Sequence, residues 1–140
     1  MSQTRDAMIA ELKRVAVPVL RSLGFKGSFP HFRRETDTRI DLLTFQFSMG
    51  GGQFVIEIGS FPSAGYELYG KVVPAAEVKM RHLLRRLRLG AKDEGSDHWF
   101  SYDSDDYAGV AASVVPYIRG QAVEWWSHAE PGAAPDTGRM

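Results

Sequence analysis

The sequence contains no cysteine. This absence excludes disulfide frameworks, thiolate zinc sites, redox pairs and cysteine nucleophiles together. The sequence also has no net charge, because 17 basic residues balance 17 acidic ones, so no long-range field attracts nucleic acid or anionic lipid. No segment approaches the roughly 18 consecutive apolar residues of a membrane-spanning helix, and the amino terminus lacks the apolar core of a signal peptide. We therefore expect a cytoplasmic protein with no nucleic-acid or membrane partner.

The usual signatures of cofactor binding and catalysis are also missing. Gly50–Gly52 lies between two strand-like segments, whereas a phosphate-binding loop leads into a helix. The four histidines lack the spacing of three or four residues that places two imidazoles on one helical face; they are His31, His82, His98 and His128. No G-x-S-x-G motif exposes a serine nucleophile. We expect no cofactor, no metal and no catalytic residue, and we favour a non-enzymatic role.

The composition that is present suits one folded domain. Apolar residues make up 44% of the 140 residues and charged residues 24%, as in ordinary globular proteins, and a chain of this length buries one core. The last residues are rich in proline, glycine and alanine. We predict a single α+β domain over residues 1–128 and a disordered tail over residues 129–140.

Hydrophobic periodicity predicts helices at both ends of the domain. Apolar residues recur at steps of three and four in the first segment; they are Met8, Leu12, Val15, Val19 and Leu23. Gly24 is placed to end that helix. The same period returns between Tyr107 and Trp126, where Ser104 or Asp105 is the predicted N-cap. Because Val115 precedes Pro116, we expect a break there and a second helix from the proline.

The middle of the chain alternates with a period of two, which predicts strands. Residues 39–49 and 54–59 read as two strands joined by a glycine hairpin, and residues 29–34 complete a meander. Residues 86–89 are favoured as a strand, residues 99–102 as an edge strand or a cover over the core, and residues 71–85 stay open between helix, strand and loop. The predicted fold is an antiparallel β-meander of about four to five strands, packed with an N-terminal helix and C-terminal helices.

Charge is distributed unevenly between residues 79 and 106. A basic run comes first and an acidic run follows; they are Lys79, Arg81, Arg85, Arg86, Arg88 and Lys92, then Asp93, Glu94, Asp97, Asp103, Asp105 and Asp106. One interpretation is that the two runs pair with each other as exposed ion pairs. The other is an anion site, in which Arg86 and Arg88 present two guanidinium groups on one face of a strand.

Aromatic residues beside these charges suggest a recognition surface. Residues 60–70 read as a loop, punctuated by glycine and proline, that carries two tyrosines. The candidate binding residues are Arg86, Arg88, Asp97, His98, Trp99, Tyr66 and Tyr69. Large aromatic side chains commonly anchor protein partners. The sequence does not indicate an oligomeric state.

The order of several short motifs resembles a known family. The motifs are Leu23-Gly24-Phe25, Phe32-Arg33-Arg34, a strand containing Gln46, Arg86-Leu87-Arg88-Leu89-Gly90 and Asp97-His98-Trp99-Phe100. Over about residues 5–127 the chain resembles the bacterial family catalogued as domain of unknown function 4304. The resemblance implies no activity and no catalytic residues. The arginine strand and Asp-x-Trp element of the family coincide with Arg86, Arg88, Asp97 and Trp99.

Three functional hypotheses follow. The leading one is a non-enzymatic module that binds another protein, with an immunity-type inhibitor as its narrower form. The alternative is a small enzyme or ligand binder that acts on an anionic small molecule and requires Arg86, Arg88, Asp97 and His98 to converge in a cleft. The third is a structural domain whose arginine pairs only hold the sheet together.

Overall fold

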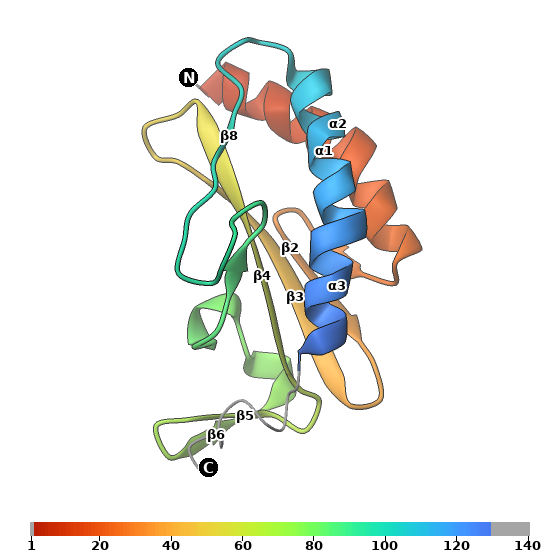
Figure 1. The fold of residues 1–140 in the computed structure, drawn as a ribbon, viewed down its shortest axis with the longest axis vertical. Coiled ribbons are helices and arrows are strands. Elements are labelled where there is room, and N and C mark those ends of the chain that lie inside the picture. The colour runs from red at the N-terminus through yellow and green to blue at the C-terminus, as the bar shows by residue number, and fades with distance from the viewer. Residues whose placement is uncertain (1, 130–140) are drawn as a thin grey trace.

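A computed structural model of the protein describes residues 2–129, and the side chains from residue 4 onward (Figure 1). All of the predicted tail except residue 129 lies outside the described residues. The single domain over residues 1–128 stays a prediction. The architecture is α+β, with helices beside an antiparallel sheet, as the sequence predicted.

The first helix, α1 (Ser2–Ser22), ends where the sequence placed its terminus. Gly24 has a φ of 98°, a left-handed conformation that glycine adopts without steric cost. The N–H of Phe25 donates to the carbonyl of Leu20 at 2.9 Å, and the N–H of Gly24 donates to the carbonyl of Arg21 at 3.0 Å. These two bonds form a Schellman motif, which satisfies carbonyls at the end of the helix and directs the chain into the sheet.

The sheet follows the chain order for its first four strands. The strands are β1 (Lys26–Ser28), β2 (His31–Glu35), β3 (Arg39–Phe47), β4 (Gln53–Pro62), β7 (Leu87–Arg88) and β8 (Phe100–Ser101). The order across the sheet is β1-β2-β3-β4-β7, β8 pairs with the start of β4, and every pairing is antiparallel. The predicted meander and glycine hairpin are therefore confirmed.

The inner face of the sheet, which faces the helices, carries the larger core. Alternate residues of the central strands are buried there and pack with the apolar face of α1; examples are Phe45, Phe54, Ile56 and Ile58. The side chain of Trp126 is fully buried in the same core, and its indole N–H donates to the carbonyl of Gly59 at 3.1 Å. In Figure 1 the helices lie along this side of the sheet.

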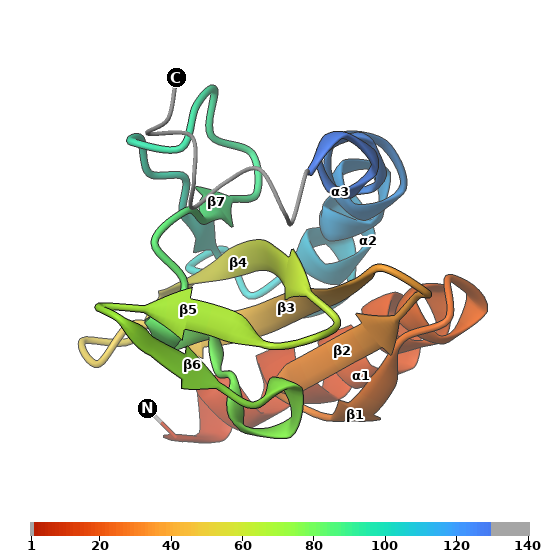
Figure 2. The same cartoon turned by 90° about the horizontal axis from the view of Figure 1, so that it is seen from below.

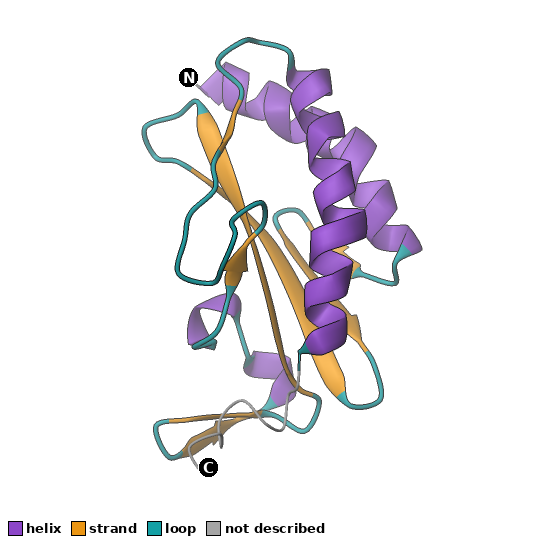
Figure 3. Cartoon of the chain, in the orientation of Figure 1, coloured by secondary structure: helices purple, strands orange, loops and turns teal. Residues whose placement is uncertain are grey.

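The outer face carries a second, smaller core. A hairpin of β5 (Tyr66–Leu68) and β6 (Lys71–Val73) is followed by two 3-10 turns, η1 (Ala75–Glu77) and η2 (Met80–His82), drawn as short purple coils in Figure 3. Seen from below in Figure 2, this hairpin lies across the sheet from α2 and α3. The outer core consists of Ile40, Leu42, Phe61, Tyr66, Val78, Met80 and Leu83.

This arrangement settles the open assignment of residues 71–85 and corrects the loop predicted over residues 60–70. The first segment is one short strand followed by two 3-10 turns, and the second contains the end of β4 and all of β5. Gly59 makes the packing possible, because a Cβ at that position would collide with Leu83 and approach the sulfur of Met80 to 3.2 Å. Because position 59 has no Cβ, Leu83 and Met80 pack directly on β4.

The carboxy-terminal helical region is continuous, so the predicted break at Val115 is wrong. It runs from α2 (Tyr107–Tyr117) through a π-helical turn, η3 (Ile118–Ala122), into α3 (Val123–His128). An internal proline costs about 3 kcal/mol. Burying Val114 and Ile118 on either side of it returns roughly 1.5–3 kcal/mol each, which outweighs that cost.

The predicted N-cap of this helical region is also corrected. The carboxylate of Asp106, not Ser104 or Asp105, accepts the N–H of Gly109 at 3.0 Å. Asp105 has a φ of 67°. It therefore forms the turn before the cap, which leaves the next residue in position to begin the helix.

Candidate functional site

The basic and acidic runs meet at two points. Arg85 donates from Nε and Nη2 to the two carboxylate oxygens of Glu94, at 3.1 and 2.7 Å, and Trp125 donates its indole N–H to the same carboxylate at 3.2 Å. The hydrogen bond from Arg85 holds the pKa of Glu94 below its ordinary value, and the same bond raises the pKa of Arg85. Arg88 Nη1 lies 3.2 Å from a carboxylate oxygen of Asp97. Internal pairing of the two runs is therefore present.

Arg86 and Arg88 share one carboxylate on the sheet. Arg88 Nε lies 3.2 Å from Glu57 Oε2, and Arg86 Nη1 lies 3.6 Å from Glu57 Oε1. Glu57 and Arg88 are directly opposed across β4 and β7. The two guanidinium groups therefore lie on one face, as alternation along a strand predicted, but both are directed at a carboxylate of the protein itself.

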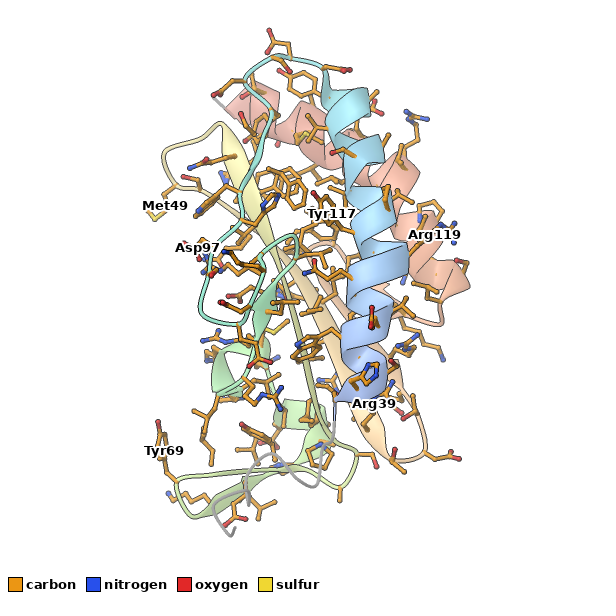
Figure 4. All side chains as sticks on the ribbon, viewed as in Figure 1. Arg39, Met49, Tyr69, Asp97, Tyr117 and Arg119 are labelled. Atoms are coloured by element: carbon orange, nitrogen blue, oxygen red, sulfur yellow. The ribbon has the colours of Figure 1, made fainter. Side chains whose placement is uncertain are left out.

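Of the next three candidate residues, Asp97 and Trp99 lie beside Arg88, whereas His98 points towards the helices. Asp97 is exposed and lies 3.2 Å from Arg88 Nη1, and Figure 4 shows it on the loop before β8. The His98 ring packs towards the helices, 4.9 Å from the ring of Phe100 and 5.7 Å from that of Tyr117, measured between centroids. Trp99 is partly exposed, with the Arg88 guanidinium 5.8 Å from its ring centre. The structure therefore brings Arg88, Asp97 and Trp99 together and turns the His98 ring away from them.

The two tyrosines also separate. Tyr66 is 7% exposed within the outer core, and its hydroxyl accepts the N–H of Leu84 at 3.1 Å, so it holds the segment before β7. Tyr69 is 87% exposed at the tip of the β5–β6 hairpin (Figure 4). Val72 and Leu84 are exposed as well. The structure therefore assigns a packing role to Tyr66 and leaves Tyr69 on the surface.

A groove on the outer face of the sheet contains residues that the sequence analysis did not select. Its volume is about 980 Å³, and it lies between strands β1 to β4 and the segment containing η2. Its charged and histidine side chains are Lys26, His31, Arg33, Lys79, Arg81, Arg86 and Glu57. Leu42, Val78 and Met80 supply apolar lining. We call this feature the outer groove.

The strand register explains why these polar side chains lie together. Lys26 is opposite Arg33 across β1 and β2. On the next row of the same face, His31 is opposite Thr44, which is opposite Glu57. The imidazole Nδ1 of His31 lies 3.1 Å from the hydroxyl of Thr44. These polar residues therefore lie on the part of the outer face that the outer core does not cover.

Most of the positive charge in the outer groove has no anionic partner. Arg33 donates to two neutral acceptors, the carbonyls of Ala75 at 3.1 Å and Val78 at 3.0 Å, which hold η1 and η2 against the sheet. Three of these cations form no ion pair within residues 4–129: the ammonium groups of Lys26 and Lys79 and the guanidinium of Arg81.

The net charge of the lining is therefore strongly positive. Five basic side chains face one carboxylate, a net charge of +4 with histidine neutral. The basic run of the sequence contributes three of the five, at positions 79, 81 and 86, while Arg85, Arg88 and Lys92 are not part of the lining. Lys26 and Arg33 come from β1 and β2, far away in the sequence. Alternation in β2 was the one signal that could have placed Arg33 on this face.

The described part of the chain gives no sign of a metal centre or a membrane span. No group of three or more histidine, aspartate or glutamate side chains is placed to hold a metal ion within it. No helix among the described residues is long and apolar enough to cross a membrane.

Comparison with known proteins identifies the family and nothing narrower. The family model described as "Domain of unknown function (DUF4304)" matches residues 16–128, which include the sheet and all of the outer groove. No curated protein and no solved structure matches significantly. The motifs in the sequence predicted the same family. The chain belongs to the DUF4304 family.

Proposed function

We propose that this protein is a non-enzymatic module that binds another protein through the outer face of its sheet. The observation that supports the proposal is the outer groove, where five basic side chains face one carboxylate. The exposed ion pairs elsewhere neutralise each other, whereas this surface keeps a net charge of +4. Unpaired charge on a concave surface steers partners of opposite charge and selects among them.

The arrangement of side chains favours binding over catalysis. Arg88 and Asp97 pair with each other, whereas His98, which the enzymatic hypothesis also needs, packs against Phe100 and Tyr117. The carboxylate of the groove, Glu57, lies between Arg86 and Arg88. This pairing occupies the carboxylate oxygens that a general base would use.

A second candidate is a binder of an anionic small molecule in the same groove. The groove volume of about 980 Å³ falls in the range of small-molecule sites, roughly 300–1,000 Å³. Arg33 and Arg86 would supply guanidinium groups for a carboxylate or phosphate. This candidate keeps the anionic ligand of the sequence analysis but replaces its residues Arg88, Asp97 and His98.

The narrower form of the leading proposal is an immunity-type inhibitor in the cytoplasm. A partner toxin would then be encoded beside this gene. A gene neighbourhood without a toxin, nuclease or secretion gene would remove this form and leave the general proposal intact.

In-cell photocrosslinking tests the general proposal. A photoreactive phenylalanine is placed in the full chain at Gln46 or Arg81, both exposed and lining the outer groove. Matched controls carry it at Ala112 or Arg119, exposed positions in the carboxy-terminal helical region. Figure 4 shows Arg119 on the far side of that region from the sheet. We expect one discrete protein adduct, identified by mass spectrometry, from the groove positions and none from the controls.

The same experiment has outcomes that contradict the proposal. A third site at Tyr69 reports on the hairpin tip. Adducts from Tyr69 alone would overturn the assignment to the outer face. The absence of adducts from every position, or equal adducts from groove and control positions, would contradict a specific protein partner.

A further inference from the structure

We infer that the outer groove binds an extended, acidic segment of a partner chain, about six residues long. This inference rests on the proposed function, because it names the part of the partner that is recognised. Charge complementarity supplies the first argument. The groove lining carries a net charge of +4, so a basic segment is repelled and a neutral one gains nothing from Lys26, Lys79 and Arg81.

The spread of the cations distinguishes a chain from a single anion. Lys26 lies on β1, and Arg86 immediately precedes β7, four strand spacings away in the sheet order. Neighbouring strands are about 4.8 Å apart, so the basic residues extend over roughly 19 Å. One phosphate or carboxylate contacts only a small part of that length. An extended chain rises about 3.3 Å per residue, so about six residues cover it.

The lining of the groove indicates the pattern of such a segment. Leu42, Val78 and Met80 provide apolar surface between the cationic side chains. Successive side chains of an extended chain point to opposite sides. A segment with acidic residues at alternate positions and small apolar residues between them can therefore place apolar side chains on this lining and carboxylates beside the flanking cations.

The cations do not contribute equally. Arg33 is committed to the carbonyls of Ala75 and Val78, and Arg86 shares Glu57 with Arg88. Lys26, Lys79 and Arg81 are exposed and, within residues 4–129, belong to no ion pair. These three side chains can turn towards a ligand without breaking a contact of the fold. We assign the electrostatic part of binding to them.

An NMR titration of the full chain tests the inference with a defined probe. The probe is a six-residue peptide of alternating glutamate and valine with both ends blocked, and its control has glutamine in place of glutamate. We expect the acidic peptide to shift the backbone amide signals of Gly27, Thr44, Gln46 and Arg81. The glutamine peptide should bind at least about tenfold more weakly, and raising the salt from about 50 to about 500 mM should weaken the acidic peptide by a similar factor.

A pair of matched double variants separates the groove from general electrostatics. Lys79→Glu with Arg81→Glu reverses two groove charges, and Lys13→Glu with Arg119→Glu reverses two exposed charges on helices. Neither pair takes part in an ion pair within residues 4–129. We expect the first variant to bind the acidic peptide at least about tenfold more weakly and the second to stay within about twofold. Circular dichroism and thermal unfolding confirm that both variants are folded.

Several results would overturn the inference. These are equal affinity for the glutamine peptide, signal shifts outside the groove, equal weakening in both double variants, or no shift up to about 10 mM peptide. Equal shifts with sodium citrate at the same affinity would assign the groove to a small anion instead. If Gln46 crosslinks a protein in cells but the acidic peptide does not bind, the proposed function stands and this inference fails. Peptide binding without any cellular adduct would support the groove chemistry and contradict the proposed function.

Discussion

We expect replacement of Asp41 by asparagine to destabilise the fold by about 3 kcal/mol. Asp41 is 0% exposed on the inner face of β3, opposite Arg34 on β2 and Ser60 on β4. Its carboxylate accepts from Arg34 at 2.8 and 3.1 Å, from Arg39 at 2.9 and 3.4 Å, and from the Ser60 hydroxyl at 3.0 Å. The carboxylate of Asp41 therefore links β2, β3 and β4 on the face of the sheet opposite the outer groove.

The magnitude follows from what the substitution leaves behind. The guanidinium of Arg34 lies 4.9 Å from the Phe25 ring centre and 5.2 Å from that of Trp126, and it also donates to the carbonyl of Leu23. Removing one partner of a buried ion pair costs about 3–5 kcal/mol. The side chains of Arg34 and Arg39 are 19% and 21% exposed, so water compensates part of the loss. We therefore take the lower end of that range.

Urea and thermal denaturation of the full chain measure this effect. For a chain of this length a loss of about 3 kcal/mol lowers the melting temperature by roughly 10 °C. The matched control is Asp97→Asn, which removes a carboxylate 3.2 Å from Arg88 but 64% exposed, and should cost less than about 1 kcal/mol. If the two variants lose the same small amount, burial does not govern these ion pairs and the reasoning is refuted.

Three further predictions concern other parts of the fold. The hydrogen bond from Arg85 lowers the pKa of Glu94, so its stabilisation is present above the ordinary glutamate pKa and is lost as the pH falls through the lowered value. Glu94→Gln should therefore cost under about 1 kcal/mol in urea unfolding at pH 7, and progressively less as the pH falls below the ordinary glutamate pKa. Gly59→Ala should cost about 1–3 kcal/mol, because its Cβ collides with Leu83; an unchanged urea midpoint would contradict this packing. Gln121→Ala should cost about 1–2 kcal/mol and speed hydrogen exchange at the Gly90 amide. The side chain of Gln121 accepts the N–H of Gly90 at 2.6 Å and donates to the carbonyl of Ala91 at 2.7 Å. Unaltered exchange would count against this bridge.

The sequence predicted those parts of the fold that depend on local pattern. Helical spacing predicted the buried face of α1, and Gly24 predicted its end, because both features depend on residues that are close in the chain. Alternation identified β3 and β4, since one face of each meets the helices. The proline rule failed at Val115 because burial of Val114 and Ile118 outweighs a local backbone preference.

The outer groove could not be predicted because tertiary packing brings its residues together. Lys26 and Arg33 come from β1 and β2, whereas Lys79 and Arg81 come from a segment that folds back over the outer face. That fold-back places Leu83 and Met80 against Gly59, a contact that only the packed structure reveals. The uneven charge singled out residues 79–106. The sequence did not show that some of these residues line the groove while others form exposed ion pairs.

The scaffold and the outer groove rest on two different hydrophobic cores, so their stabilities can be considered separately. The segment between β4 and β7 packs on the outer core, while the helices pack on the inner one. Opening of residues 63–84 would expose the smaller core alone, so this segment can act as its own cooperative unit within a folded sheet. One side of the groove can therefore change in length, charge or partner through substitutions that leave the helix-packed core unaltered. Under the proposed function, the partner can then change while the framework stays the same.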